Sequence, residues 1–103
     1  MSQEVNLPNS IPELFDRVEA LLEFAPGTFD NPRSFRTERG RLARALIVAA
    51  ALYRFGLSQT AAIEVLPWDR GTITTAIRDR DDRFAEQMAE LLPNLIGSGK
   101  WDL

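Results

Sequence analysis

The stretch from Leu57 to Arg78, LSQTAAIEVLPWDRGTITTAIR, decides how this chain folds. Ser58 precedes a short apolar helix, Pro67 interrupts the chain, and Asp69 precedes a second helix. Ser and Asp are favoured at helix starts because their side-chain oxygens accept a free backbone N–H of the first turn. The stretch therefore predicts two short helices joined by a tight turn, which is a helix-turn-helix.

The residues before this stretch predict a central helix. From Leu42 to Tyr53 the sequence is apolar almost without interruption, which is typical of a helix packed on several sides. Thr37 is suited to cap the start of this helix, and Gly56 is suited to end it. We therefore expect the helix to lie inside the fold.

A first helix is predicted at residues 10–25. Ser10, with Glu13 three residues later, forms a capping box, and apolar residues then recur at three- and four-residue spacing. Three acidic residues are predicted on its outer face: Asp16, Glu19 and Glu23. The following segment, 26–36, is predicted to be a connecting loop. Two aromatic residues are expected to anchor this loop to the core: Phe29 and Phe35.

The helix that begins after Asp69 has two possible lengths. Its apolar spacing allows it to run unbroken to Leu92 or to kink near Asp81 and Asp82. The charged run at 78–83, RDRDDR, is typical of a solvated helix face. Four apolar residues further along could belong to the core or to a dimer interface: Phe84, Met88, Leu91 and Leu95.

Together these elements predict an all-α fold, a small bundle of four to five helices that contains the helix-turn-helix. The 103 residues and the 45% hydrophobic content indicate a single domain spanning residues 1–103. Within it we expect an acidic N-terminal helix at 10–25 and a helix-turn-helix core at 37–92. Residues 1–9 and 96–103 are expected to be flexible tails.

Composition excludes several kinds of chemistry. The chain has no Cys and no His, which removes disulfides, zinc fingers, thiol nucleophiles and the usual general base. We therefore expect no enzymatic activity, no metal and no cofactor. The start of the chain has no signal-peptide pattern, and the longest apolar run, at 45–53, is too short to span a bilayer. A cytoplasmic protein with no membrane contact is expected.

Charge is distributed unevenly along the chain. Twelve basic and fifteen acidic residues give a net charge of −3. Residues 1–32 carry −5 and residues 84–103 carry −2, whereas residues 33–83 carry +4. The basic excess surrounds the predicted helix-turn-helix, so the negative total does not exclude a nucleic-acid partner.

The same stretch resembles DNA-binding helix-turn-helix proteins. Their common bacterial pattern matches the runs LSQ at 57–59 and DRGTIT at 69–74, with Leu66 between them. Over residues 41–78 the chain is similar to the C-terminal DNA-binding domain of the replication initiator DnaA, a Trp-repressor-like domain. Four residues match the recognition helix of that family: Asp69, Thr72, Ala76 and Arg78. Three others replace its Arg, His and Thr: Trp68, Arg70 and Gly71. The resemblance implies a helical DNA-binding domain of bacterial or phage origin.

A recognition helix carries short polar and basic side chains on the turns that enter the major groove. Arg can bind guanine, Thr can contact the thymine methyl group, and Gly permits close approach. The candidates for base contacts are therefore Arg70, Gly71, Thr74, Thr75 and Arg78. The candidates for contacts to the DNA backbone are Arg33, Arg36, Arg39, Arg41, Arg44, Ser58, Gln59 and Thr72.

These observations predict a regulator of transcription or replication that binds double-stranded DNA. One recognition helix reads a short site, and a homodimer through Phe84, Met88, Leu91 and Leu95 would lengthen it. The acidic N-terminal helix would face away from DNA or bind a protein partner. The alternative is an acidic helical adaptor or inhibitor that binds a protein and keeps the helix-turn-helix only as a scaffold.

Overall fold

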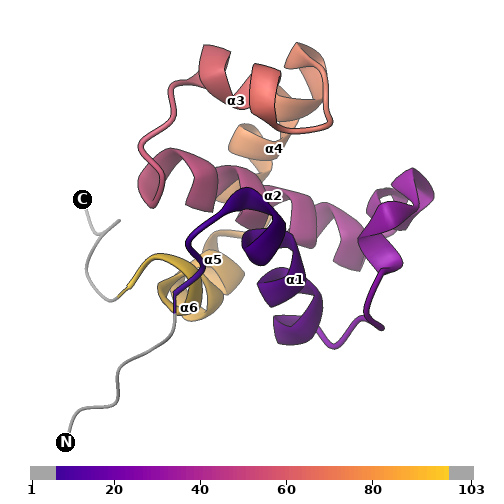
Figure 1. The fold of residues 1–103 in the computed structure, drawn as a ribbon. Helices are drawn as coiled ribbons and strands as arrows, with labels where there is room; N and C mark the ends of the chain where they lie inside the picture. The colour runs from indigo at the N-terminus through magenta and orange to yellow at the C-terminus, as the bar shows by residue number, and fades with distance from the viewer. Residues whose placement is uncertain (1–6, 98–103) are drawn as a thin grey trace, which may run out of the picture.

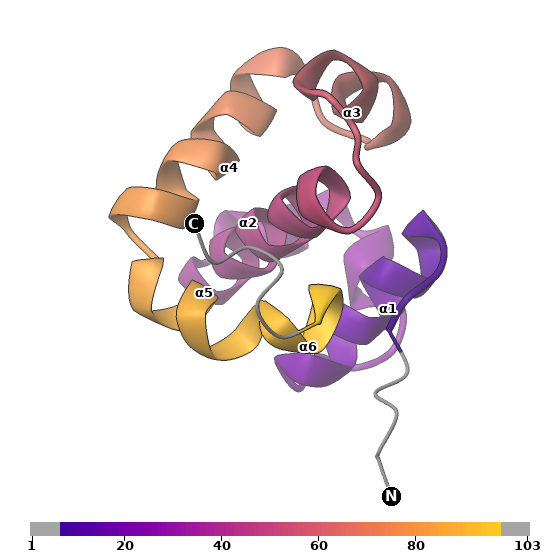
Figure 2. The ribbon, with the colours of Figure 1, turned by 90° about the vertical axis from the view of Figure 1, so that its left-hand side faces the viewer.

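Helix α2 (Glu38–Tyr53) lies at the centre of the computed structural model, which describes residues 7–97 (Figure 1). Its residues from Ala45 to Ala51 are all buried, as their apolar character predicts. The predicted N-cap is present, since the Thr37 hydroxyl oxygen accepts the Gly40 N–H at 2.9 Å. Figure 2 shows the other helices arranged around α2. The prediction of a central helix packed on several sides is therefore confirmed.

The described residues form helices and connecting turns, with no strand among residues 7–97. In chain order the elements are α1 (Ile11–Leu21), the 3-10 helices η1 (Thr28–Asp30) and η2 (Pro32–Arg36), α2, α3 (Gln59–Val65), α4 (Arg70–Asp82), α5 (Ala85–Leu91) and α6 (Pro93–Ile96). The predicted all-α class is confirmed, although residues 7–97 hold six α-helices instead of four or five. Each helix in this range is too short or too polar to cross a membrane.

Helix α1 begins where the sequence predicts and ends earlier. The Ser10 hydroxyl oxygen accepts the Glu13 N–H at 3.3 Å, and the Glu13 carboxylate accepts the N–H of Asn9. The helix closes at Glu23, which has a φ of +63° and whose N–H bonds to the Ala20 carbonyl oxygen at 3.1 Å. Glycine is the usual residue in this left-handed conformation, so the sequence at Glu23 carries no signal for a helix end.

The segment predicted as a loop, 26–36, contains η1 and η2 and packs against the core. Phe29 and Phe35 are 8% and 4% exposed, which confirms them as anchors. Segment η2 also lies directly against the start of α2, because a Cβ built on Gly40 would be 1.9 Å from the Ser34 carbonyl oxygen. Only glycine permits this approach, so Gly40 sets how closely η2 packs on α2.

The two helices predicted after residue 57 begin at their predicted caps. The Ser58 hydroxyl oxygen accepts the Ala61 N–H at 3.0 Å, and the Asp69 carboxylate accepts the Thr72 N–H at 2.8 Å. Of the two lengths allowed for the second helix, the interrupted one is correct. A turn at 83–84 separates α4 from α5, just beyond the predicted kink, and the chain changes direction there (Figure 2).

The C-terminal helices complete the core of a single chain. Phe84, Met88 and Leu95 are buried, and Leu91 alone among the four predicted interface residues stays partly exposed. The assignment of these four residues to a dimer interface is therefore corrected. Three of the side chains already pack inside one chain and are not available to a second copy. Phe84, Met88 and Leu95 therefore belong to the core.

Residues 7–9 contact the folded core, although the sequence places them in a tail. Pro8 is buried, and the Arg54 guanidinium donates to the Pro8 carbonyl oxygen at 3.3 Å and to the Asn9 side-chain oxygen at 3.2 Å. At the other end, Ile96 is buried as the last residue of α6. The remaining parts of the two predicted tails, 1–6 and 98–103, lie outside the described residues.

Candidate nucleic-acid interface

One side of α4 is accessible to solvent and carries the residues predicted to contact bases. Four of the five are exposed, and one is partly buried: Arg70, Gly71, Thr74 and Arg78, with Thr75. Positions 70, 74 and 78 follow at four-residue spacing, so their side chains share one stripe along the helix. The opposite side belongs to the core, since Ile73 and Ala76 are buried as predicted.

The arginines on this stripe are not engaged elsewhere in the described structure. Neither Arg70 nor Arg78 forms a side-chain hydrogen bond or an ion pair within residues 7–97. Gly71 leaves the same side open, because an added Cβ there would meet only the Asp69 carboxylate, at 3.8 Å. An anionic partner could therefore reach two guanidinium groups without first displacing an internal contact.

The arginines predicted to follow the DNA backbone fall into two groups. Arg33 and Arg36, on η2, are exposed and make no ion pair with any described residue. The other three lie on α2: Arg39 and Arg41 bond to other parts of the protein, and Arg44 is partly buried and lines a cavity. The Arg39 guanidinium donates to the Leu22 carbonyl oxygen and lies 4.6 Å from the centre of the Phe24 ring. The structure thus separates a group that the sequence treats as one series.

Asp79, on α4, forms an ion pair with Arg41 of α2. Arg41 donates to both carboxylate oxygens of Asp79, at 3.1 and 3.3 Å, and the Asp79 side chain is only 10% exposed. The prediction that the run 78–83 is a solvated face is therefore wrong at Asp79. This carboxylate lies in the contact between α2 and α4, and the pair joins the central helix to the candidate recognition helix.

Arg44 lies near this pair and is in no ion pair with another described residue. Burial, and then the nearby charge of Arg41, lowers the pKa of the Arg44 guanidinium. The Arg44 Nε is buried and has no hydrogen-bond partner among the described residues. A buried donor in this state ordinarily costs about 1–3 kcal/mol, and because this atom is closed to solvent, an acceptor outside the chain cannot reach it.

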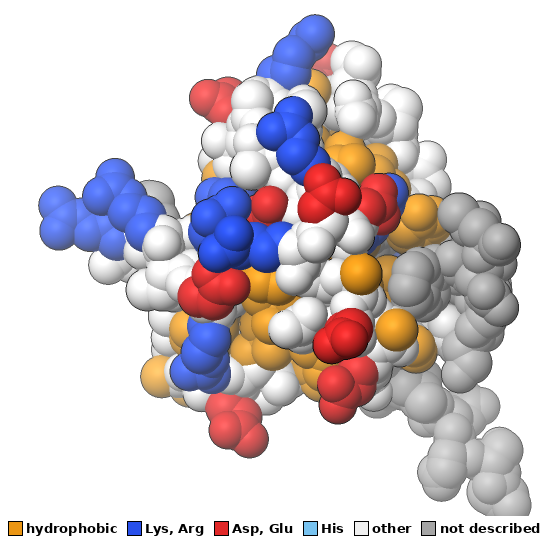
Figure 3. All heavy atoms as spheres, turned by 180° about the vertical axis from the view of Figure 1, so that it is seen from behind, with side chains coloured by type: hydrophobic (Ala, Val, Ile, Leu, Met, Phe, Trp, Pro, Cys, Tyr) orange, Lys and Arg blue, Asp and Glu red, His pale blue; other side chains and the backbone are white. Residues whose placement is uncertain are grey.

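Further ion pairs neutralise part of the basic segment. Arg83 donates to Glu38 at 2.7 Å, and Arg80 donates to Asp81 at 2.9 Å. Each of these hydrogen bonds lowers the pKa of its carboxylate. Figure 3 shows the face opposite to that of Figure 1, with Arg side chains gathered at the upper left and acidic side chains among and below them. The surface is therefore mixed in charge, and the unpaired arginines are the ones that could attract a polyanion.

The other predicted backbone contacts lie at the starts of α3 and α4. Ser58 and Gln59 are exposed, and the Ser58 hydroxyl keeps its hydrogen for donation while its oxygen caps α3. Thr72 is partly buried, and its backbone N–H lowers the pKa of the capping carboxylate of Asp69. Ser58 and Gln59 thus remain accessible to a partner, whereas Thr72 is partly occupied by the cap.

A cavity of about 260 Å³ opens beside the first turn of α4. Its apolar wall contains the aromatic rings of Phe29, Phe35 and Trp68, and both Arg36 and Arg44 line it. Trp68 stacks on Phe15 with ring centres 5.7 Å apart, and it meets Phe35 edge to face at 5.0 Å. The sequence did not predict this cavity, since its walls come from segments far apart in the chain.

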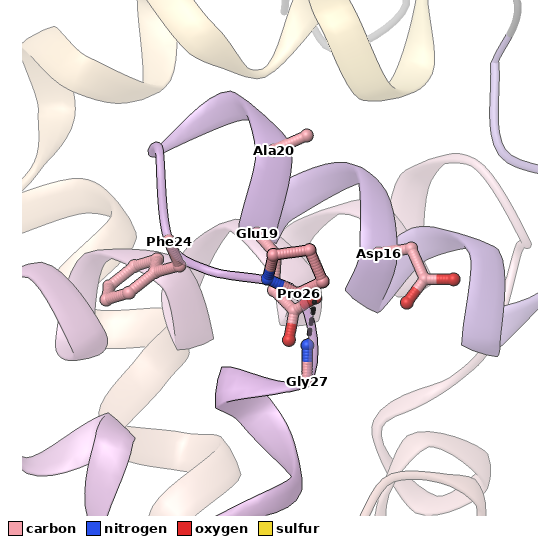
Figure 4. Close-up of a pocket in the computed structure, with 6 residues that line it drawn as sticks. All are labelled: Asp16, Glu19, Ala20, Phe24, Pro26 and Gly27. Atoms are coloured by element: carbon pink, nitrogen blue, oxygen red, sulfur yellow. Dashed lines mark hydrogen bonds between the residues drawn. The ribbon is translucent and has the colours of Figure 1, made fainter.

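A second cavity, of about 360 Å³, lies at the end of α1, and its mostly apolar lining includes two acids, Asp16 and Glu19 (Figure 4). Glu19 is 6% exposed there, and the prediction that it lies on the outer face of the helix is wrong. Its two carboxylate oxygens accept the N–H groups of Gly27, at 3.2 Å, and Phe29, at 2.8 Å. The Glu19 carboxylate stabilises the turn into η1 through these two hydrogen bonds, and that turn buries the carboxylate.

Comparison of the chain with known protein families, with curated proteins and with solved structures found no match. Within residues 7–97, no three or more acidic side chains are grouped in a way that could hold a metal ion. The exposed stripe of α4 and the two exposed arginines of η2, Arg33 and Arg36, are the accessible positive groups that suit a nucleic-acid partner.

Proposed function

We propose that this protein is a helix-turn-helix regulator of transcription or replication that binds duplex DNA. In this proposal α4 is the recognition helix in the major groove, and α3 crosses the DNA backbone before it. The observation that carries the proposal is the exposed stripe of Arg70, Thr74 and Arg78, whose two arginines have no partner among the described residues. The core on the opposite side would hold that stripe in a fixed position.

The chemistry of the stripe suits base recognition. A guanidinium group can donate two parallel hydrogen bonds to guanine, and a Thr methyl group can contact the methyl group of thymine. Arg70 and Arg78 are two helical turns apart, so they would contact different base pairs. Gly71, beside Arg70, adds no side chain that would hold the helix away from the groove.

Contacts to the DNA backbone would come from fewer residues than the sequence suggests. Arg33 and Arg36 are exposed on η2, and Ser58 and Gln59 are exposed at the start of α3. These four can reach phosphates without breaking an ion pair within residues 7–97. Arg41 would have to leave Asp79 to do so, and we therefore propose that it supports the helices and does not bind DNA.

A second copy would lengthen the short site that one recognition helix can read. It would have to use a surface other than that of Phe84, Met88, Leu91 and Leu95, because three of these four residues are buried. We propose no particular surface for it. The number of copies on the DNA can be counted in the binding experiment below.

The alternative function is an acidic adaptor or inhibitor that binds a protein. It is favoured by the exposed acidic side chains of α1, which are Glu13 and Asp16, with Glu23 just after the helix. Such a protein would form a stable complex with a partner protein. That complex would survive Arg70→Ala, whereas sequence-specific DNA binding would not.

The proposal is tested by selecting duplexes from a random pool and measuring affinity by fluorescence anisotropy. Arg70→Ala and Arg78→Ala should each weaken the selected site by about 5- to 150-fold, because a bidentate contact to a base contributes about 1–3 kcal/mol. Arg17→Ala is the matched control, since Arg17 lies on α1 and makes no ion pair within residues 7–97. The affinity of the Arg17→Ala protein for the selected duplex should be unchanged.

The salt dependence of affinity distinguishes contacts to the DNA backbone from contacts to bases. Arg33→Ala and Arg36→Ala should weaken selected and random duplexes equally, and each should reduce the slope of log affinity against log salt by about one. Absence of binding at about 50 mM salt, where release of counterions favours the complex, would contradict the proposal. Equal effects of Arg70→Ala and Arg17→Ala would contradict the recognition role of α4.

A further inference from the structure

The cavity between η2, α2 and the turn before α4 has two properties of a small-molecule site. Its volume is about 260 Å³, whereas a cavity of about 150 Å³ already accommodates a benzene molecule. Its wall is more apolar than polar and includes the aromatic residues Phe29, Phe35 and Trp68. A mostly apolar pocket with a few polar groups is the usual form of a ligand site.

The polar groups of the cavity are biased toward positive charge. Arg36 and Arg44 line it, and Asp30 is the acidic residue among its lining side chains. None of the three is in an ion pair with another described residue. The Nε of Arg44 is buried without a hydrogen-bond partner, and burial lowers the pKa of this guanidinium. An anion entering the cavity would lie beside the positive charges of Arg36 and Arg44, although the buried Nε itself is out of its reach.

We propose that this cavity binds a small planar anion, a single aromatic ring that carries one carboxylate. The ring would lie against Trp68 and Phe35, and the carboxylate would accept hydrogen bonds from Arg44 and Arg36. The site does not include the exposed stripe of α4, although Arg36 also belongs to the proposed contacts to the DNA backbone, and the proposal does not depend on DNA binding.

The charge and apolar character of the lining also favour one class of ligand over others. Two guanidinium groups and one carboxylate leave a net charge of +1, which a single negative charge on the ligand would balance. A doubly charged phosphate would meet repulsion from Asp30, and it would leave the aromatic wall without an apolar partner. A neutral ring would fill the space but would not balance this positive charge. The cavity therefore favours an aromatic carboxylate over both.

The test uses the fluorescence of Trp68, whose ring forms part of the wall. The chain has two Trp residues, so Trp101→Phe leaves Trp68 as the single reporter. The full chain carrying this substitution is titrated with benzoate, with benzamide and with inorganic phosphate. Benzoate should give a saturable change in emission. Benzamide and phosphate should each bind at least about tenfold more weakly than benzoate. Benzamide lacks the charge that strengthens the hydrogen bonds to the arginines, and phosphate lacks the ring that would be buried against the aromatic wall.

Variants of the arginines then locate the anion. Arg44→Gln and Arg36→Gln should each weaken benzoate binding by at least about tenfold, and Arg44→Lys should restore part of the Arg44 loss. Arg33→Gln is the matched control, because Arg33 lies on the same 3-10 helix but does not line the cavity. Circular dichroism of each variant verifies that it is folded, and Arg36 is exposed enough to be replaced safely.

Three results would overturn the proposal. Equal affinity for benzoate and benzamide in the Trp101→Phe protein would show that no anion is recognised, and this comparison needs no arginine variant. Phosphate binding as tight as that of benzoate would show that the ring contributes nothing. No change in emission up to about 10 mM benzoate, beyond the range expected for a ligand of this size, would show that the cavity binds no such molecule.

Discussion

Arg41 and Asp79 face each other across the contact between α2 and α4, and the arginine donates to both oxygens of the carboxylate. The two residues are 38 positions apart in the chain. Arg44 lies close enough to feel both charges, so one buried carboxylate serves two arginines on α2 and balances the charge of only one of them. The orientation of the proposed recognition helix is therefore tied to the central helix by a charged contact as well as by apolar packing.

Replacing Asp79 should destabilise the protein more than replacing a solvent-exposed acid. Asp79→Ala leaves Arg41 and Arg44 near each other without the carboxylate, and we expect a loss of about 1–3 kcal/mol in the free energy of unfolding. Urea denaturation measures this loss. Asp82→Ala is the control, because Asp82 is exposed on the same helix, and its change should stay within about 0.5 kcal/mol. A similar effect of the two substitutions would show that the ion pair contributes nothing.

Gly40→Ala should destabilise the protein although alanine is the better helix former. The added Cβ would lie 1.9 Å from the Ser34 carbonyl oxygen and 2.7 Å from the Phe35 Cα, and backbone atoms cannot rotate away as a side chain can. We expect a loss of about 1–3 kcal/mol in unfolding free energy. Gly71→Ala is the control, since it has open space and should gain up to about 1 kcal/mol from helix propensity. Thermal unfolding of the two variants should shift in opposite directions, and parallel shifts would contradict the close approach at Gly40.

Glu19→Gln should loosen the turn that leads into η1. The carboxylate accepts one N–H on each oxygen, whereas the amide of Gln has a single acceptor and would direct its NH₂ at a backbone donor. We expect a loss of about 1–3 kcal/mol in unfolding free energy, measured with urea. Asp16→Asn, on the exposed side of the same helix, should change stability little. Faster hydrogen exchange at the Gly27 and Phe29 amides would localise the effect, and unchanged exchange would refute it.

The Asp69 cap should make stability dependent on pH in the acid range. The Thr72 N–H lowers the pKa of Asp69 in the folded chain below the ordinary value of about 3.9. The folded state therefore gains stability from this group above that ordinary pKa, and it loses that gain as the pH falls through the lowered pKa. Asp69→Asn keeps an oxygen acceptor but does not titrate, so its stability should fall less than that of the natural chain below about pH 4. Urea midpoints measured between pH 2 and pH 6 compare the two proteins, and parallel curves would contradict this role of Asp69.

Helix starts could be predicted from the sequence because the interactions that define them are local. The caps at Ser10, Thr37, Ser58 and Asp69 each join a side chain to a backbone N–H three residues away. The exposed side of α4 was also predictable, since it follows from a helical period and from the apolar residues opposite. Signals of this kind lie within a few neighbouring residues.

The features that the sequence did not reveal depend on contacts between distant segments. Asp79 looks like one more charge in a polar run until α2 packs against α4 and buries it. Glu19 looks solvated until the chain turns back so that residues 27 and 29 can donate to it. Glu23 follows α1 in a left-handed backbone conformation that is uncommon for glutamate, so its residue type does not predict it. For the same reason the arginines of α2 could not be told apart from those of η2.

The central position of α2 has a consequence for how this chain unfolds. Helices α1, α3, α4 and α6 and segment η2 all pack on this one helix, so neither half of the sequence has a core without it. Loss of α2 would expose the apolar faces of these five elements at once, and the chain should therefore unfold in a single cooperative transition. The amide protons of α2 should exchange only through global unfolding, and they should be the slowest in the molecule.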